Sequence, residues 1–222
     1  MQPYALCLDS DGLCLRNGNS TVRVDFIAGS NAHRRLHGGG RTQPLAKAIG
    51  LKIGNIVPSV LDCTAGLGTD AFVLASLGCK VFLCERSETV HSLLQDGLMR
   101  AKAGADNDVA RIVGRMQLQQ VDAKNYLQVM TEPVDVIYLD PMFPERAKKA
   151  AVKKGMVAFH ALVGADEDAD ALLPLALDKA IYRVVVKRSR HAPFLGNLKP
   201  SFSFEGESTR FDIYARQSML KA

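Results

Sequence analysis

Four acidic side chains and a pair of glycines are spaced in a way that could build a binding site. Each acid ends or directly follows a strand-like run of residues, and the four are Asp62, Glu85, Asp122 and Asp140. Gly66 and Gly68 follow the first of these runs, where they let the backbone turn tightly and approach a ligand. Carboxylates beside such a turn accept hydrogen bonds from a ribose diol or an amine. One such acid is typical of a helix N-cap, but four in register indicate a site for a nucleoside-containing ligand.

The segment Asp-Pro-Met-Phe-Pro, at 140–144, follows the last of these runs and holds two prolines that stop any regular element. Its first four residues resemble the [DNS]-P-P-[YFW] motif of enzymes that methylate exocyclic amines, and this resemblance implies that the Asp140 carboxylate and the Pro141 carbonyl accept hydrogen bonds from the amine. Phe143 is predicted to stack on a nucleobase, although it could equally be a core residue beneath the loop. The pattern indicates no role for Met142.

The glycine loop by itself does not separate two cofactors. Residues 66–71 also satisfy the dinucleotide pattern G-x-G-x-x-A, and Glu85 lies near the spacing that NAD sites use. Asp62, however, stands in the turn itself, and Asp70 puts a carboxylate at the start of the next helix, where it would repel a pyrophosphate. The ammonium and sulfonium groups of S-adenosylmethionine tolerate such acids. We therefore favour that methyl donor over NAD.

Basic residues gather near the same predicted edge, and they indicate a polyanionic partner. The candidates for phosphate contacts are Arg34, Arg35 and Arg41 in a glycine-rich stretch, Lys148 and Lys149 after the proline loop, and Lys187 and Arg188 at a later strand end. Each group alone would be typical of a solvated face. His33 and His37 have the spacing of metal ligands but no further ligands beside them, so no metal site is expected.

The elements that must position these residues alternate between strands and helices. Strands are predicted at 56–62, 80–85, 116–123, 134–140 and 183–189, helices at 69–78, 87–104, 123–130 and 168–180, and a closing antiparallel pair at 201–206 and 210–216. This order predicts an α/β fold, a mainly parallel sheet with helices on both faces. Asp-Gly and Asn-Gly turns between short strands at 4–28 predict β-hairpins. We expect a small β-rich subdomain at 1–56 and a main domain at 57–222.

Composition favours an ordinary globular protein: 47% of the residues are hydrophobic, 23% are charged and the net charge is +5. No run of about 18 apolar residues suggests a membrane span, and the N-terminal residues lack the pattern of a signal peptide. Five cysteines without C-x-x-C spacing are typical of reduced thiols. We expect a cytoplasmic protein, and its oligomeric state is not predicted.

Several strings resemble known methyltransferases. DCTAGLGTD at 62–70 is similar to motif I of the Rossmann-like class I methyltransferases, and DPMF at 140–143 to a variant of their [DNS]-P-P-[YFW] motif. TAGLGTDAFVLASLGC, YLDPMFP, YRVVVKRS, RFDIYA and HRRLHGGGR together resemble the RsmJ family of bacterial 16S ribosomal RNA guanine-N2 methyltransferases over most of the chain. Met142 departs from the amine-methylating motif, which weakens any rule of base recognition based on it.

The resemblance implies a class I sheet of seven strands with an antiparallel C-terminal strand, S-adenosylmethionine as cofactor, and 16S ribosomal RNA or the 30S subunit as partner. The cofactor contacts that it implies are Thr69, Asp70, Glu85, Arg86, Asp122, Ala123 and Asp140, beside Asp62, Gly66 and Gly68 from the residue pattern. Other amine targets such as adenine N6, a small NAD-dependent oxidoreductase, and a non-catalytic RNA-binding module stay open as alternatives.

Overall fold

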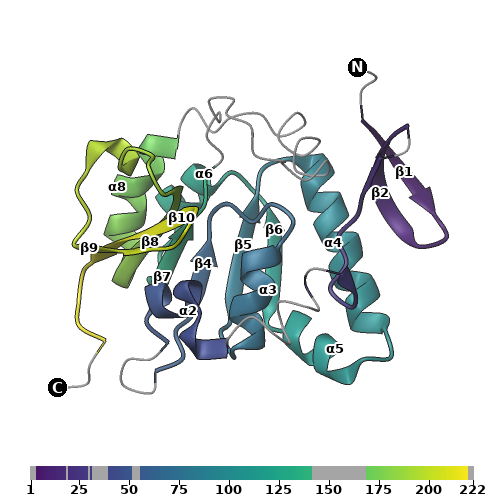
Figure 1. Cartoon of the computed structure of the whole chain (residues 1–222), viewed down its shortest axis with the longest axis horizontal. Helices are drawn as coiled ribbons and strands as arrows, with labels where there is room; N and C mark the ends of the chain where they lie inside the picture. The colour runs from purple at the N-terminus through teal and green to yellow at the C-terminus, as the bar shows by residue number, and fades with distance from the viewer. Residues whose placement is uncertain are drawn as a thin grey trace.

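The structure is a computed structural model that describes residues 4–18, 20–29, 31, 40–51, 56–141 and 169–219. Its centre is a seven-stranded sheet in the order β6-β5-β4-β7-β8-β10-β9 (Figure 1). The strands are β4 (Val60–Asp62), β5 (Val81–Glu85), β6 (Met116–Gln120), β7 (Val134–Leu139), β8 (Ala180–Ser189), β9 (Phe202–Glu205) and β10 (Thr209–Ala215).

The first five strands of this sheet in spatial order, β6 to β8, are parallel, and β10 and β9 add antiparallel pairs at the C-terminal side. The predicted mainly parallel sheet with an antiparallel C-terminal strand is thus confirmed. Because neighbouring parallel strands run the same way, β4, β5, β6, β7 and β8 all finish at one edge, called here the carboxyl edge.

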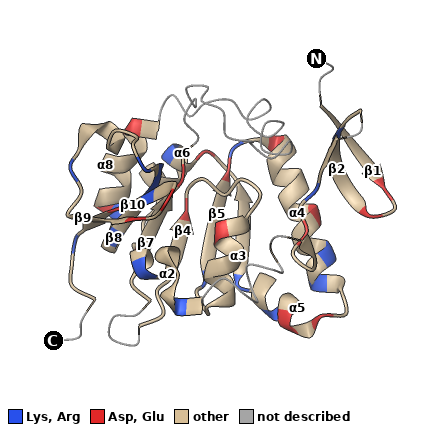
Figure 2. Cartoon of the chain, in the orientation of Figure 1, with Lys and Arg blue, Asp and Glu red and all other residues tan. Residues whose placement is uncertain are grey.

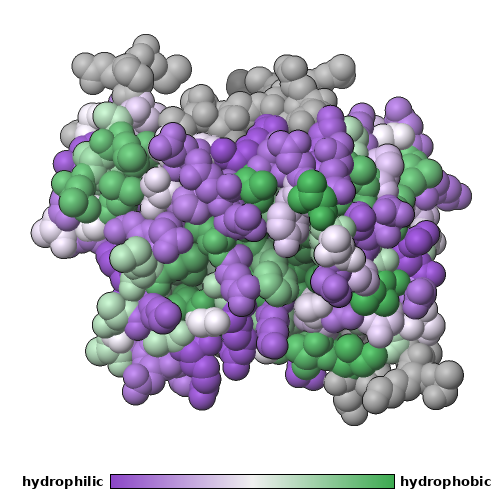
Figure 3. Space-filling view, turned by 180° about the vertical axis from the view of Figure 1, so that it is seen from behind, coloured by the Kyte–Doolittle hydropathy of each residue, from purple (hydrophilic) through white to green (hydrophobic). Residues whose placement is uncertain are grey.

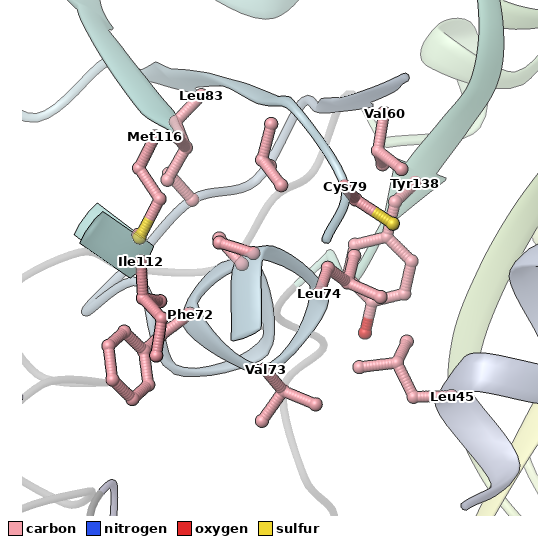
Figure 4. Close-up of a cluster of buried hydrophobic side chains, with 14 of the residues drawn as sticks. Leu45, Val60, Phe72, Val73, Leu74, Cys79, Leu83, Ile112, Met116 and Tyr138 are labelled. Atoms are coloured by element: carbon pink, nitrogen blue, oxygen red, sulfur yellow. The ribbon is translucent and has the colours of Figure 1, made fainter. Parts of the chain in front are cut away.

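Helices cover both faces of the sheet because its strands are apolar on both sides. In β7, Val136 and Tyr138 pack into one hydrophobic cluster, while Ile137 and Leu139 pack into the other. The first cluster includes side chains of α2 (Pro44–Ile49), α3 (Thr69–Ser76), α4 (Glu88–Ala103) and α5 (Asn107–Val113). The second includes α6 (Ala123–Val129), α8 (Ala169–Lys179) and the short helix η2 (Leu195–Asn197). Figure 4 shows the first cluster around α3, with the Tyr138 ring among its side chains.

The N-terminal residues form a separate antiparallel sheet of β1 (Ala5–Asp9), β2 (Gly12–Asn17) and β3 (Ser20–Val22). This confirms the predicted hairpins. The sheet lies beside α4, where the Leu13 amide donates to Asp96 and the Arg100 guanidinium donates to the Val24 carbonyl (Figure 1). Figure 3 shows apolar side chains at this end of the molecule, where Leu6 and Leu8 are exposed. The predicted division of the chain at 56/57 stays a prediction.

Several element bounds differ from the sequence prediction by a few residues, and a missed helix and a shortened strand have clear local causes. Helix α5 was not predicted, although Asp106 caps it by accepting from the amides of Asp108 and Val109. At seven residues it is too short for a periodic pattern to stand out. Strand β4 begins at Val60, later than predicted, because Pro58 lacks the amide that a central strand needs.

Candidate cofactor and acceptor site

The loop after β4 is built around Asp62, whose side chain is 2% exposed. Its Oδ1 atom accepts from the Thr64 amide at 3.0 Å and from the Thr64 hydroxyl at 3.3 Å. Gly66 and Gly68 then adopt φ values of 53° and 72°, a region that side chains disfavour. A Cβ atom on Gly68 would also meet the Leu94 side chain at 2.7 Å. The chain therefore turns sharply from the strand into α3, as the glycine pattern predicted.

Glu85, at the end of β5, holds this loop from the neighbouring strand. One of its carboxylate oxygens accepts from the Gly66 amide at 3.0 Å, and the other accepts from the Ser87 amide at 2.8 Å. The Ala65 amide donates to the Cys84 carbonyl in the same region at 3.2 Å. The two strand ends are thus tied through backbone amides, and Glu85 itself is buried.

Asp70 lies in the first turn of α3 and faces the end of the sheet. Its Oδ2 atom accepts from the Tyr138 hydroxyl at 2.7 Å and from the Lys187 ammonium at 2.8 Å. Burial, with Asp70 and Asp140 nearby, raises the pKa of Tyr138 well above its ordinary value. The phenol therefore keeps its proton and remains a hydrogen-bond donor to Asp70.

Asp140 follows β7 directly and is linked to the same group. Its amide donates to the Thr64 hydroxyl at 2.7 Å, and its Oδ2 atom accepts from the Lys187 ammonium at 2.8 Å. Pro141 after it is buried. The end of β7 is thereby joined to the loop after β4 by Thr64 and to α3 by Lys187. Figure 2 shows acidic residues collected at the carboxyl edge.

The electrostatics of this edge are dominated by acids. The pKa of Asp62 is raised to about 7, chiefly by burial and in smaller part by the neighbouring charges of Asp70 and Asp140, while the hydrogen bonds from Thr64 act in the opposite direction. Burial lowers the pKa of the Lys187 ammonium, but Asp140 and Asp70 outweigh that effect, so its net pKa shift is upward. Lys187 therefore stays charged between two carboxylates.

Two cysteines near the edge, Cys63 and Cys84, are not nucleophilic at neutral pH because their thiols are protonated. Burial raises the pKa of Cys84 to about 12 and that of Cys63 well above its ordinary value. Both thiols stay protonated, so this edge offers carboxylates and carbonyls rather than a thiolate. Among the residues that the structure describes, no group of three His, Cys, Asp or Glu side chains could hold a metal ion. Within the same residues, no helix is both long and apolar enough to cross a membrane.

The other predicted cofactor contacts lie at the same edge. Asp122 caps α6, accepting from the amides of Lys124 and Asn125 at 2.9 and 3.2 Å. Ala123 is buried behind it, Thr69 is half-buried at the start of α3, and Arg86 is exposed after β5. The structure therefore brings these residues to one edge, while their contacts with a cofactor stay predictions.

The predicted phosphate-binding residues fall into three situations. Arg41 lies in a short 3-10 helix, η1 (Gly40–Thr42), and is exposed. It is near Cys79, which precedes β5, so the prediction that Arg41 lies near the carboxyl edge is wrong. Lys187 is bound to two acids, and Arg188 is 4% exposed and donates twice to the Pro193 carbonyl, at 3.1 and 2.7 Å. The remaining phosphate-binding candidates lie outside the described residues: Arg34, Arg35, Lys148 and Lys149. Phe143, which was predicted to stack on a nucleobase, also lies outside them.

Sequence reasoning missed the roles of Thr64, Tyr138 and Lys187. Thr64 stands two residues after Asp62, a spacing typical of turns in which an aspartate accepts from the following backbone. Tyr138 is itself one of the buried residues of β7, so the sequence pattern marked it as a core residue and gave no sign of a polar contact. Lys187 lies at the end of a strand, where the rule that selected the acids would also have selected a cation.

The donor set suits a cationic nucleoside better than a dinucleotide. Asp62, Asp70 and Asp140 offer carboxylates to an ammonium, a sulfonium or a hydroxyl group. A pyrophosphate at the start of α3 would lie beside the carboxylate of Asp70, which repels it. The residues present therefore fit S-adenosylmethionine.

Comparison with known proteins supports this interpretation. The chain matches the family described as "Putative SAM-dependent methyltransferase" over residues 1–216. It is 54% identical to Ribosomal RNA small subunit methyltransferase J of Cellvibrio japonicus, over 97% of this chain and 84% of that protein. The protein of the same name from Aeromonas salmonicida is 56% identical, over 89% and 79%. The fold is similar to the crystal structure of a SAM-dependent methyltransferase from Neisseria gonorrhoeae, with a TM-score of 0.76, 37% identity and coverage of 96% and 83%.

Proposed function

This chain belongs to the family of S-adenosylmethionine-dependent methyltransferases that includes Ribosomal RNA small subunit methyltransferase J, and we propose that it methylates the exocyclic N2 amine of a guanosine in 16S ribosomal RNA. Membership of the family assigns S-adenosylmethionine as the cofactor, in place of the NAD that the glycine pattern left open. The ribosomal RNA substrate is supported by the names of the relatives, and the guanosine N2 amine by the resemblance of several strings of the chain to the RsmJ family of guanine-N2 methyltransferases.

The observation that carries the proposal is the link between the two halves of the site. The Asp140 amide donates to the Thr64 hydroxyl at 2.7 Å, so the residue expected to receive the amine is tied to the loop expected to hold the methyl donor. Reacting groups that a protein holds in fixed contact gain a large rate advantage, on the order of 7 kcal/mol or more. This link supports the proposal, because it would hold an acceptor amine close to the methyl donor.

Residues of the donor half would hold the cofactor through its polar groups. Gly66 and Gly68 give a turn without side chains, and Asp62, Asp70 and Glu85 supply carboxylates around it. When bound, S-adenosylmethionine supplies an electrophilic methyl group on a positively charged sulfur. The acids of this edge favour that positive charge, whereas an anionic ligand would be repelled.

Residues of the acceptor half would orient the substrate amine. A guanine 2-amino group is a poor nucleophile because its lone pair is delocalised into the ring. The Asp140 carboxylate and the Pro141 carbonyl would accept its two N–H groups and favour the geometry in which the lone pair is available. Asp140 would also stabilise the positive charge that develops on nitrogen. It need not remove a proton first, because an alkylated amine of this kind becomes strongly acidic.

Recognition of the RNA would rest on exposed basic residues and on the proline loop. Arg41 is the exposed member of the predicted phosphate-binding set among the described residues. The contributions of Phe143, Arg34, Arg35, Lys148 and Lys149 are proposals from the sequence, because these residues lie outside the described ranges. A ribosomal RNA substrate also implies a cytoplasmic location.

The proposal is tested by methylation of 30S subunits from a strain that lacks the gene. Purified protein and S-adenosylmethionine with a labelled methyl group are added, and the modified nucleoside is identified by mass spectrometry after digestion. We expect N2-methylguanosine in the 16S ribosomal RNA, with naked 16S RNA assayed in parallel as the second substrate form. Label on adenine N6, or no label on either substrate, would refute the proposal.

A further inference from the structure

The Lys187 side chain connects two acids that come from separate parts of the chain. Its ammonium donates to Asp70 Oδ2 and to Asp140 Oδ2, both at 2.8 Å. Asp70 belongs to the helix after the glycine loop, and Asp140 precedes the proline loop. We propose that Lys187 is a positioning residue for methyl transfer, which fixes the Asp140 carboxylate and ties it to the cofactor half of the site. This inference rests on the proposed function.

The register of the sheet explains why Lys187 reaches both acids. β7 and β8 are parallel, and Leu139, the last residue of β7, pairs with Val186. Lys187 therefore lies level with Asp140, one residue beyond the last pair of the two strands. On β8 the side chains of Val184 and Val186 pack into the cluster around α8, while Val185 packs on the α3 side. Alternation thus turns Lys187 towards α3, which carries Asp70.

The energetics favour a functional role over a purely stabilising one. An ammonium that is taken partly out of water needs opposite charges, and here two carboxylates supply them. Yet partly buried ion pairs contribute little net stability compared with apolar side chains of similar size. The contribution of Lys187 to folding stability therefore does not explain why a lysine is at this position, whereas its effect on the two carboxylates does.

Two consequences for catalysis follow from these contacts. With Oδ2 bound to Lys187, the Asp140 carboxylate has a fixed orientation before the substrate amine arrives. The positive charge of the ammonium also favours the ionised form of the Asp140 carboxyl group. The other titratable groups that face this edge are Asp62, Asp70 and Tyr138. Because the two carboxylates neutralise the Lys187 ammonium, it would attract a phosphate only weakly.

Three variants test the assignment: Lys187→Met removes the charge, Lys187→Arg keeps it, and Arg183→Met is the matched control. Arg183 is a buried cation on the same face of β8, about 13 Å away from Lys187, and donates to the Ala48 carbonyl. Thermal melts establish that each variant is folded. The measurements are kcat and the KM for the RNA substrate, the salt dependence of RNA binding, and the titration of the Asp140 carboxyl carbon by NMR in the cofactor-free protein.

We expect Lys187→Met to lower kcat by about 10- to 100-fold while the KM for RNA stays within about twofold. Lys187→Arg should recover part of the loss, and Arg183→Met should lower the melting temperature but leave kcat unchanged. The titration midpoint of Asp140 should move to higher pH in Lys187→Met, because a cation has been removed from the carboxylate. The slope of RNA affinity against salt should stay that of the wild type.

Other results would overturn the inference. A folded Lys187→Met variant with wild-type kcat would do so, as would an unchanged titration midpoint of Asp140. A raised KM, together with a salt slope smaller by about 1, would identify Lys187 as a phosphate contact instead. If the wild-type protein does not methylate ribosomal RNA although the midpoint moves as expected, the proposed function fails while the Lys187–Asp140 contact stands.

Discussion

The two halves of the carboxyl edge hold their acids by different means. On the β5 and β6 side, Glu85 and Asp122 accept hydrogen bonds from backbone amides. Where α3 of the donor half meets the ends of β7 and β8, Asp70 and Asp140 are held by the side chains of Tyr138 and Lys187. Backbone amides give a rigid cradle for a ligand that binds in one way. Side-chain contacts can instead tune charge and orientation at the place where bonds change.

If the acceptor half performs chemistry, the largest effect should come from Asp140. We expect Asp140→Ala to lower kcat by on the order of 100- to 1,000-fold, because it removes the group that orients the amine and stabilises its developing charge. Methyl incorporation into 30S subunits measures kcat. Asp140→Asn, which keeps the shape and one acceptor, should lose less. Turnover close to wild type, with unchanged cofactor affinity, would contradict the assignment.

If the donor half is a backbone cradle, Glu85→Ala should act on binding instead. The substitution leaves the amides of Gly66 and Ser87 without the carboxylate, at a cost of roughly 1–3 kcal/mol for a buried donor. We expect the Kd of S-adenosylhomocysteine to rise about 10- to 100-fold by calorimetry, with kcat at saturating cofactor within about threefold. Glu85→Gln serves as the isosteric control. A large fall in kcat without a change in Kd would contradict the prediction that Glu85 acts on cofactor binding rather than on chemistry.

Asp62, in the donor half, has the charges of Asp70 and Asp140 nearby, and its pKa should report on the negative charge of the site. Its pKa of about 7 in the folded protein exceeds the ordinary value of 3.8, so the folded state binds the proton more tightly than the unfolded state. The contribution of Asp62 to stability therefore falls as pH rises from about 4 to about 7 and is constant above that range.

Asp62→Asn removes this dependence while it keeps an oxygen that can accept from Thr64. At pH 8 we expect the variant to be more stable than the wild type by about 1–2 kcal/mol, a part of the roughly 4 kcal/mol that three pKa units represent. At pH 4 the two should be equally stable. Urea denaturation at both values measures the difference. Equal stability at pH 8 would show that Asp62 titrates normally.

The smallest expected effects separate an exposed cation from an internal one. Arg41→Ala should weaken RNA binding a few-fold and lower the salt slope by about 1, because one phosphate contact is lost. Arg188→Met should leave the slope unchanged but lower the melting temperature, because Arg188 holds the Pro193 carbonyl. Filter binding across a salt series measures the slope. A reduced slope in Arg188→Met would mean that this arginine reaches the RNA.

The amino-acid sequence by itself determined the alternation of strands and helices and the gathering of acids at one edge. It did so because the relevant signals are local. Apolar runs mark buried strands, Gly66 and Gly68 mark a turn, and an aspartate such as Asp122 caps the helix that starts beside it. Helix α5 carried the same kind of signal in Asp106, over a segment too short for the periodicity to be noticed.

Only the tertiary structure decided which of these side chains meet. Lys187 and Asp70 are separated by 117 positions and Tyr138 and Asp70 by 68, so no spacing rule relates them. Their contacts depend on the register of β7 against β8 and on the docking of α3 over the end of the sheet. The sequence predicted phosphate contacts for Lys187 and Arg188 because both are cations near a strand end. Alternation along β8 places these neighbours on opposite faces, and so gives each a different internal partner.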